Sequence, residues 1–302
     1  MCAGIKLLIL TFLTGYCMET VAQRVIPLYT DGNIPNALPV KDAEENDNGK
    51  LYQVSRPELT VYLPVSGNGI GIIVCPGGGY GNIVIEREGY KVAGDLVKSG
   101  YTVFVLKYRL PSDNWMQNKS IGPAQDAQQV IKMVRQQATD WGIDPGKIGI
   151  MGFSAGGHLA STAGTHFKQS YIDNKENINL RPDFMVLIYP VINMSDELAH
   201  QGSRNNLLGV NPGTAMIARF SNDQRVTSET PPVFLLHTQD DDVVDVRNSL
   251  VFYEALVRNK VPSELHVYPH GPHGFAIDPP FDRWLVMCKD WIQRVVKPAA
   301  EQ

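Results

Sequence analysis

Short apolar runs separated by longer amphipathic stretches fill the chain from residue 58 onward. The runs are continuously apolar and rich in β-branched residues, a pattern typical of strands with both faces buried. Gly and Pro residues, which favour turns, bound several of the runs. The predicted strands are residues 59–65, 70–75, 101–106, 147–151, 184–189, 233–237 and 264–268.

The amphipathic stretches between these runs predict helices. Within residues 123–141, apolar side chains recur with the spacing of one helical face, at Ala127, Val130, Ile131 and Val134. Further helices are predicted at residues 155–167, 246–259 and 281–296. Strands that alternate with helices join through right-handed crossovers. The predicted fold class is therefore α/β, with a mostly parallel, twisted sheet and helices on both faces.

Two polar stretches depart from this alternation. Residues 24–57 are rich in Asn, Asp, Pro and Gly and include an acidic patch at 42–45. We interpret them as a lead-in loop before a single catalytic domain over residues 58–302. Residues 193–230 carry many Asn, Ser and Arg residues and little strand signal. They are predicted to form a small insertion that lies like a lid over the carboxyl edge of the sheet.

The first 23 residues have the organisation of a secretory signal peptide. A basic position, Lys6, precedes the apolar segment 7–13, and small or polar residues follow at 20–23. The apolar segment is too short to span a bilayer comfortably, although an uncleaved anchor is the alternative. The three residues before Cys17 match a lipidation signal poorly. We expect a secreted or periplasmic protein whose mature chain has no membrane span.

Composition narrows the classes of function. The chain has 302 residues, 43% of them hydrophobic, and a net charge of −4 with no run of Lys or Arg. This argues against a nucleic-acid partner. Outside the N-terminal segment only Cys75 and Cys288 remain, and no Cys/His spacing resembles a zinc site. No metal or organic cofactor is implied, and the pattern specifies no oligomeric state.

Ser154 is the candidate nucleophile. It is the central residue of Gly152-Phe153-Ser154-Ala155-Gly156, between a predicted strand and a predicted helix. A sharp turn there strains the backbone and projects the hydroxyl from the sheet edge, while the small neighbours avoid a clash. The motif alone is weak, since a serine in a glycine-rich loop also matches it. The context of strand, turn and helix favours the nucleophile.

A serine hydroxyl needs a base and an orienting carboxylate, and in this type of fold they follow the serine in the order acid, then histidine. Three aspartates, Asp240, Asp241 and Asp242, come directly after the predicted strand 233–237. Any of the three could supply the acid, and the others would then be turn formers.

The candidate base lies after the last predicted strand, where both His270 and His273 occur. His273 is favoured because the small Gly274 follows it and lets the loop return over the sheet edge. His270 is interpreted as a loop residue. His158, about one turn after Ser154, is expected to pack or bond beneath the serine turn, and the other histidines lack a suitable position.

A third loop supplies candidate oxyanion donors. The predicted strand 70–75 ends at Pro76, and three glycines follow. Glycines let a backbone approach a substrate closely and aim N–H groups at one point. We expect Gly78 and Gly79 to donate, together with the N–H of Ala155. The alternatives are a flexible turn or a phosphate cradle, but no Lys-Ser/Thr pair follows the glycines.

Five segments together resemble the α/β-hydrolase superfamily, over about residues 58–297. They are "IIVCPGGGYGNI", "VFVLKYRLP", "IGIMGFSAGGHLA", "PPVFLLHTQDDDVV" and "YPHGPHGF". The chain is similar to the branch related to hormone-sensitive lipases and prolyl-oligopeptidase-type enzymes. It most resembles secreted bacterial carbohydrate esterases that remove acetyl, and sometimes feruloyl, groups from xylan. The resemblance selects Asp241 as the acid, because Val243 and Val244 follow at the offset usual in that family.

The resemblance implies a serine carboxylesterase that acts on an acetylated, xylan-type carbohydrate through an acyl-enzyme. Tyr80 and Trp115 would line its acyl or sugar pocket, or else are ordinary packing. The alternatives are a secreted prolyl-oligopeptidase-like peptidase, a general short-chain esterase, or a non-catalytic binding protein on the same scaffold. Such peptidases usually carry a large preceding domain, which residues 24–57 are too few to supply. A glycoside hydrolase is disfavoured because its paired-carboxylate pattern is missing.

Overall fold

A computed structural model describes residues 22–30, 32–39, 44–275 and 281–296 of the chain. The predicted signal segment therefore lies outside the described residues, except for its last two positions. Among the described residues, no helix is both long and apolar enough to cross a membrane.

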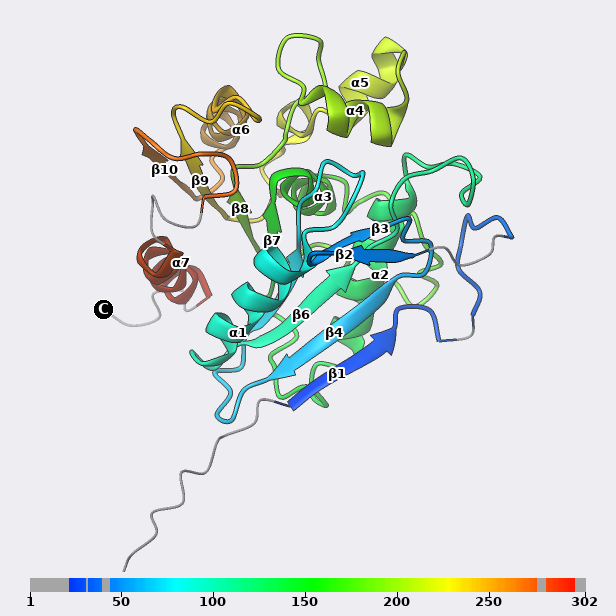
Figure 1. Ribbon diagram of the computed structural model, residues 1–302. Helices are drawn as coiled ribbons and strands as arrows, with labels where there is room; N and C mark the ends of the chain where they lie inside the picture. Colours follow the sequence, from blue (N-terminus) through cyan, green and yellow to red (C-terminus); the bar gives the residue numbers. More distant parts are fainter. Residues whose placement is uncertain (1–21, 31, 40–43, 276–280, 297–302) are drawn as a thin grey trace, which may run out of the picture.

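An eight-stranded sheet forms the centre of the molecule, with the strand order β1-β4-β6-β5-β7-β8-β9-β10 (Figure 1). Six strands, from β6 to β10 in that order, run parallel, while β4 pairs antiparallel with β6 and β1 antiparallel with β4. This confirms the predicted α/β class. The strands are β1 (Ala22–Pro27), β4 (Glu58–Leu63), β5 (Gly71–Cys75), β6 (Thr102–Lys107), β7 (Ile148–Phe153), β8 (Phe184–Ile188), β9 (Val233–Thr238) and β10 (Ser263–Tyr268).

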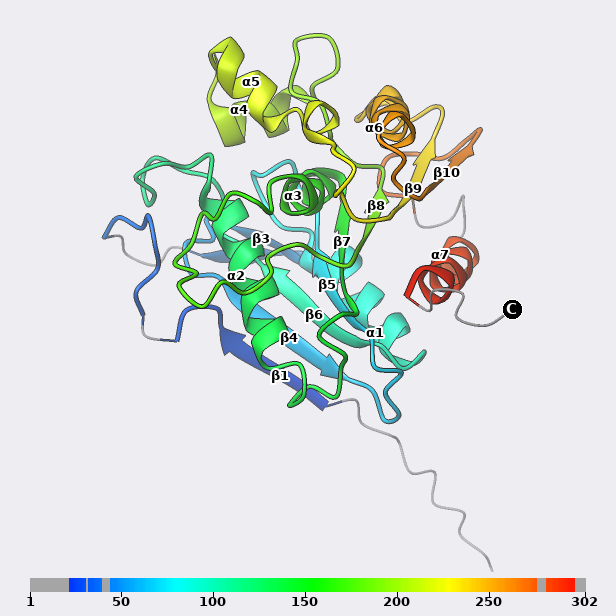
Figure 2. The same cartoon turned by 180° about the vertical axis from the view of Figure 1, so that it is seen from behind.

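Helices cover both faces of the sheet, as Figures 1 and 2 show. α1 and α7 lie on one face, and α2, α3 and α6 lie on the other. Every residue of β5, β7, β8 and β9 is buried between these layers, which explains why their sequences are apolar without alternation. The helices are α1 (Lys91–Val97), α2 (Gly122–Gln136), α3 (Ser154–Thr165), α6 (Arg247–Arg258) and α7 (Phe281–Val296).

The stretch 24–57 is not simply a loop, which corrects the sequence interpretation. β1 begins at Ala22 and extends the sheet by pairing with β4. Two short strands, β2 (Glu45–Asp47) and β3 (Lys50–Tyr52), form a separate antiparallel pair. β1 has one neighbour only and is largely exposed, so its sequence mixes polar and apolar residues and carries no apolar-run signal.

A fully buried ion pair fastens this N-terminal segment to the body. The Arg109 Nη2 and Asp126 Oδ1 atoms are 2.8 Å apart, and both side chains are 0% exposed. The Tyr29 hydroxyl donates to the same carboxylate, and Arg109 Nη1 donates to the Pro35 carbonyl. Removing one partner of such a pair typically costs about 3–5 kcal/mol. The "LKYRLP" segment therefore has a structural role here.

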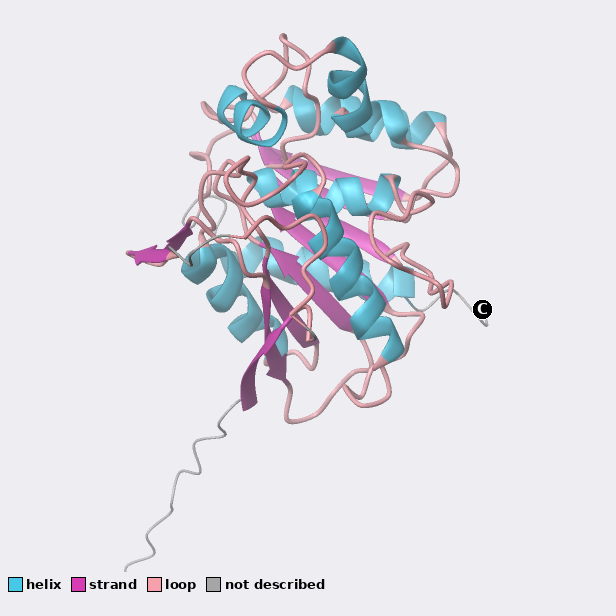
Figure 3. Cartoon of the chain, turned by 90° about the vertical axis from the view of Figure 1, so that its right-hand side faces the viewer, coloured by secondary structure: helices cyan, strands magenta, loops and turns pink. Residues whose placement is uncertain are grey.

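Residues 193–230 form helices, which the sequence did not predict. α4 (Gln201–Leu208) and α5 (Thr214–Phe220) are followed by a 3₁₀ turn, Asn222–Arg225. They form a cap beyond α3 (Figures 1 and 3). The Asn206 Nδ2 group donates to the Gly79 carbonyl at 2.9 Å. The insertion thus touches the loop that leaves the carboxyl end of β5.

A buried histidine joins this insertion to α3 and to the glycine loop. His158 in α3 accepts a hydrogen bond from the Tyr80 hydroxyl at Nδ1, at 2.9 Å, and its Nε2 donates to the Phe220 carbonyl at 2.8 Å. Burial lowers the pKa of His158 to about 4. Burial, followed by nearby arginine charges, lowers the pKa of His166 to about 4 as well. Both imidazoles are therefore neutral in the folded protein at neutral pH.

The lowered pKa values of His158 and His166 predict a loss of stability in acid. In the unfolded chain they take up protons near pH 6.5, whereas the folded protein binds them only near pH 4. The free energy of unfolding is therefore expected to fall between these pH values, by up to about 1.4 kcal/mol per pH unit for each histidine. Urea unfolding at a series of pH values measures this slope. His158→Asn should make it shallower, and an unchanged slope would contradict the prediction.

Candidate active site

Ser154 stands at the junction of β7 and α3 in a strained backbone conformation. Its φ is +51°, a left-handed value that is costly for a residue with a side chain. The packing around it explains why small residues flank it. A Cβ on Gly152 would lie 2.2 Å from the Gly156 carbonyl oxygen, and one on Gly156 would lie 2.1 Å from that of Cys75. Both positions need glycine for the turn to close.

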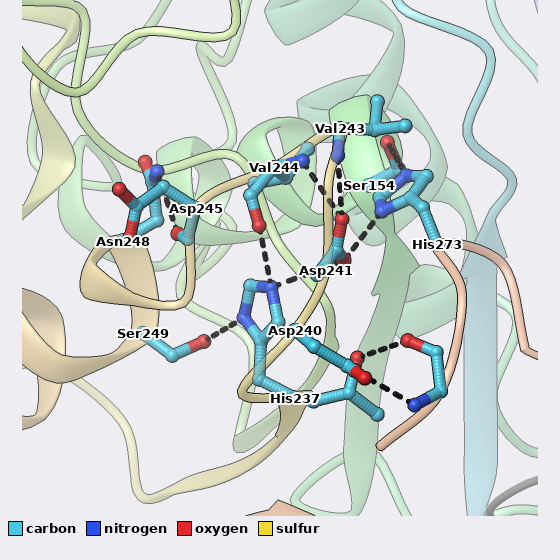
Figure 4. A network of polar contacts seen from close by, with 12 residues as sticks. Ser154, His237, Asp240, Asp241, Val243, Val244, Asp245, Asn248, Ser249 and His273 are labelled. Carbon is cyan, nitrogen blue, oxygen red and sulfur yellow. Dashed lines mark hydrogen bonds and ion pairs between the residues drawn. The ribbon is translucent and has the colours of Figure 1, made fainter. Parts of the chain in front are cut away.

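Three loops that lie far apart in the sequence meet at this turn (Figure 4). The His273 Nε2 atom is 2.9 Å from the Ser154 Oγ, and its Nδ1 is 2.7 Å from the Asp241 Oδ2. The loops follow β7, β9 and β10, and the carboxyl ends of parallel strands share one edge of the sheet. In this arrangement Nδ1 donates to the carboxylate and Nε2 accepts from the serine hydroxyl.

Asp241 is the one of the three neighbouring aspartates that reaches the histidine. Its Oδ1 accepts from the backbone N–H groups of Val243, at 3.0 Å, and Val244, at 2.9 Å. Burial alone would raise the pKa of Asp241, but hydrogen bonds from His237, His273 and the backbone hold it well below its usual range. The carboxylate is therefore charged whenever the protein is folded near neutral pH.

Asp240 has a different partner. Its Oδ2 is 3.0 Å from the Nδ1 of His270, and its Oδ1 accepts from the Gly271 N–H. The hydrogen bond from His270 lowers the pKa of this carboxyl group. Both side chains of the Asp240–His270 pair are largely exposed. The two loops thus carry two parallel Asp–His pairs, and only the inner one contacts Ser154.

His237 is a neighbour of the site that the sequence reasoning had set aside. It lies in β9, is 0% exposed, and brings its Nε2 within 3.3 Å of the Asp241 Oδ2. The same nitrogen donates to the Val244 carbonyl, while Nδ1 accepts from the Ser249 hydroxyl at 2.8 Å. His237 does not reach Ser154, but it supports the carboxylate from below. Its position four residues before Asp241, at the end of a buried strand, is the signal that could have found it.

The glycine loop after β5 lies against the serine turn. A Cβ on Gly77 would approach the Ser154 Cβ to 2.9 Å. Gly78 and Gly79 have φ values of +126° and +63°, a region that favours glycine. Within the described parts of the chain, their N–H groups and that of Ala155 make no hydrogen bond, whereas the Gly77 N–H is occupied by Glu88. The N–H groups of Gly78, Gly79 and Ala155 are thus available, and their role as oxyanion donors stays a prediction.

The two aromatic residues expected to line the pocket have their polar atoms bonded within the protein. Tyr80 is 2% exposed, and its hydroxyl is used by His158, so it is a packing residue. Trp115 donates from Nε1 to the Leu110 carbonyl. It borders a separate hollow of about 520 Å³, which it shares with residues of the N-terminal segment. Of the two interpretations that the sequence left open, packing fits Tyr80, and a pocket-lining role for Trp115 stays a prediction.

His200 takes a position near the site that the sequence did not reveal. It caps α4, and its Cε1 would be 3.6 Å from a Cβ on Gly79. The Ser203 N–H donates to its Nδ1. Burial, and then the charge of His273, lower the pKa of His200. A neutral imidazole from the insertion therefore borders the glycine loop.

The described residues contain no group of three His, Cys, Asp or Glu side chains that could hold a metal ion. Cys75 and Cys288 are buried free thiols. Burial raises the pKa of both, so neither is a reactive thiolate.

The chain is similar in sequence to known enzymes. An acetylxylan esterase from Xylanibacter ruminicola is 34% identical over 260 residues, which are 84% of this chain and 50% of that protein. Endo-1,4-beta-xylanase B from Butyrivibrio fibrisolvens is 36% identical over 220 residues, 70% of this chain and 34% of that protein. The chain thus spans about half the length of the first relative and about a third of the second.

A solved structure resembles the chain along most of its length. It is the acetyl ester-xyloside bifunctional hydrolase from Caldicellulosiruptor lactoaceticus, with 38% identity and a TM-score of 0.78. The match covers 90% of this chain and 96% of that one. The profile of the BD-FAE family matches residues 59–256, which include the serine turn, the glycine loop and Asp241. The chain therefore belongs to the BD-FAE family and has the α/β-hydrolase fold.

Proposed function

We propose that the protein is a serine carboxylesterase that removes O-acetyl groups from xylan-type polysaccharide or oligosaccharide. The observation that carries this proposal is the continuous chain of hydrogen bonds from Asp241 through His273 to Ser154, beside a loop of unoccupied N–H donors. The similarity to an acetylxylan esterase and to an acetyl ester-xyloside hydrolase supports the choice of substrate.

Each side chain in this chain of hydrogen bonds has one role in the proposed reaction. Ser154 attacks the acetyl carbonyl carbon, while His273 Nε2 takes the hydroxyl proton. The same imidazole then gives that proton to the departing sugar oxygen, which leaves an acetyl-enzyme. Water, deprotonated by His273, attacks this ester, and the imidazolium returns the proton to the Ser154 oxygen as the bond to it breaks and acetate leaves. Asp241 holds the tautomer with a proton on Nδ1 and stabilises the imidazolium in both halves of the cycle.

The negative oxygen that forms at each attack needs donors already in place. The N–H groups of Gly78, Gly79 and Ala155 supply them, since the turn of Ser154 places the amino end of α3 next to the glycine loop. Loss of one such donor typically lowers kcat by about 10²–10³-fold. The amino end of α3 adds a positive partial charge on the same side.

The surroundings of the site support an acetyl group as the acyl group and a sugar as the leaving group. The insertion brings polar side chains such as His200 and Asn206 to the glycine loop, which suits a hydroxyl-rich leaving group better than a long acyl chain. Feruloyl esters, simple short-chain esters and peptides are the alternatives that an assay separates. We also propose export from the cytoplasm, which the basic and apolar pattern of residues 1–23 supports.

We expect purified protein to release acetate from acetylated xylan and p-nitrophenyl acetate, and Ser154→Ala to abolish both activities, because among the described residues Ser154 is the hydroxyl that bonds to His273. An aminoacyl p-nitroanilide panel tests the peptidase alternative, and methyl ferulate tests the feruloyl alternative. Full activity of Ser154→Ala, or preferential cleavage of the anilides, would refute the proposal.

Replacement of the proposed catalytic acid, Asp241, gives a second prediction, for which the neighbouring Asp240 offers a matched control. Asp241→Asn is expected to lower kcat by about 10⁴-fold, the loss found when the corresponding acid of a serine protease is changed, because the amide stabilises the wrong imidazole tautomer. Asp240→Asn removes the neighbouring carboxylate and should change kcat little. Initial rates on p-nitrophenyl acetate measure both. Equal losses in the two variants would contradict the assignment of Asp241.

A further inference from the structure

Glu88 is a buried carboxylate that the proposed reaction does not use. It is 3% exposed and lies in a single π-helical turn, η1 (Ile85–Tyr90), between the glycine loop and α1. π-helical turns are rare and often occur at functional sites. A buried charge is costly unless its hydrogen-bond capacity is used, so the partners of this carboxylate indicate its role.

One carboxylate oxygen of Glu88 holds the glycine loop. The Gly77 N–H donates to Oε2 at 2.7 Å, which is a short, charge-assisted hydrogen bond. It fixes the peptide that precedes Gly78 and Gly79, the two proposed oxyanion donors. It also occupies the Gly77 N–H, so this amide is not available to the reacting oxygen.

The other oxygen reaches toward the histidine side of the site. The Tyr189 hydroxyl donates to Oε1 at 3.2 Å, and Arg87 Nη2 donates to the same atom at 3.0 Å. Burial, and then the charge of Glu88, raise the pKa of Tyr189, so its hydroxyl remains a donor. One carboxylate therefore receives one backbone and two side-chain hydrogen bonds.

Both of these side-chain donors lie against the segment that carries His273. The Tyr189 ring stands edge-on to the His273 ring, with 4.8 Å between centroids. Tyr189 has a φ of +38°, a strained value that persists only when its surroundings hold it. A Cβ on Gly274 would lie 2.6 Å from Arg87 Nη2. Thus one partner of Glu88, Tyr189, contacts the His273 ring, and the other, Arg87, lies beside Gly274.

We propose that Glu88 is a positioning residue that sets the oxyanion loop and the histidine loop in register with each other. Its Oε2 fixes the Gly77 peptide, and its Oε1 fixes the Tyr189 ring behind His273. This inference rests on the proposed function, because it assigns Glu88 a task in the same site. Glutamine has nearly the same shape but offers one acceptor oxygen, so Glu88→Gln can satisfy only one of the two sides.

The test compares Glu88→Gln and Glu88→Ala with the unmodified protein on p-nitrophenyl acetate. Misplacement of oxyanion donors acts on the transition state, so kcat should fall with little change in KM. We expect kcat/KM to fall by about tenfold in Glu88→Gln and by about a hundredfold in Glu88→Ala, as for partial and full loss of an oxyanion donor. Tyr189→Phe, which breaks only the Oε1 side, should cost less than Glu88→Ala.

An independent readout separates positioning from mere stability. A boronic acid forms a tetrahedral, anionic adduct with the active serine, so its inhibition constant should rise by the same factor as kcat/KM falls in each Glu88 variant. Asp183→Asn is the matched control. Asp183 likewise accepts from a backbone N–H, that of Ile148 at 2.8 Å, and from Arg135 at 2.7 Å, but at the amino end of β7. It should lower the Tm without changing kcat/KM.

Three outcomes would overturn the inference. Glu88→Gln and Glu88→Ala could retain the kcat/KM of the unmodified protein, boronate affinity could stay unchanged while kcat/KM falls, or Asp183→Asn could lose as much kcat/KM for the same loss of Tm. Failure of the proposed function looks different. In that case the unmodified protein and Ser154→Ala would be equally inactive toward every ester, and the role assigned to Glu88 would fall with it.

Discussion

The strained backbone of Ser154 is the constraint on which the rest of the site depends. A left-handed residue with a side chain persists only where its surroundings over-determine it. Here Gly156 approaches the Cys75 carbonyl oxygen closely, and β7 is buried between two helical layers. These contacts hold the backbone of the turn in its strained conformation. The strain places the hydroxyl at the sheet edge and the amino end of α3 directly beneath it, so nucleophile and anion site come from one local feature.

The remaining groups of the site are placed by the parallel sheet. The carboxyl ends of β5, β7, β9 and β10 lie at one edge of the sheet. The loops that follow these strands therefore start close together and need only short excursions to meet. Asp241 shows how firmly such a loop end can be held, because two backbone amides and two histidines surround its carboxylate. An acid held by these contacts and charged at neutral pH orients His273, so the position of the base is set before substrate arrives.

Polar contacts link the parts of the site that the sheet does not order. Glu88 joins the glycine loop to the aromatic support of His273, and His158 joins α3 to the insertion. The insertion in turn touches Gly79 through Asn206. Glu88 and His158 are buried and have hydrogen-bond partners, so they favour one arrangement of the segments around them. The site is therefore held by a small set of directional contacts around a nonspecific apolar core.

The sequence by itself determined the α/β class, the strands of the core and the local turn at Ser154, because continuous apolar runs and glycine spacing are local signals of buried strands and tight turns. It also limited the acid to three aspartates, and family resemblance selected one. The edge strand β1, the helices of 193–230, and the roles of Tyr80, His237 and Glu88 were decided only by the tertiary structure. A strand of mixed polar and apolar residues becomes regular because it pairs with a neighbour. A buried polar side chain takes its role from partners that are distant in the chain. Neither feature therefore produces a local sequence pattern.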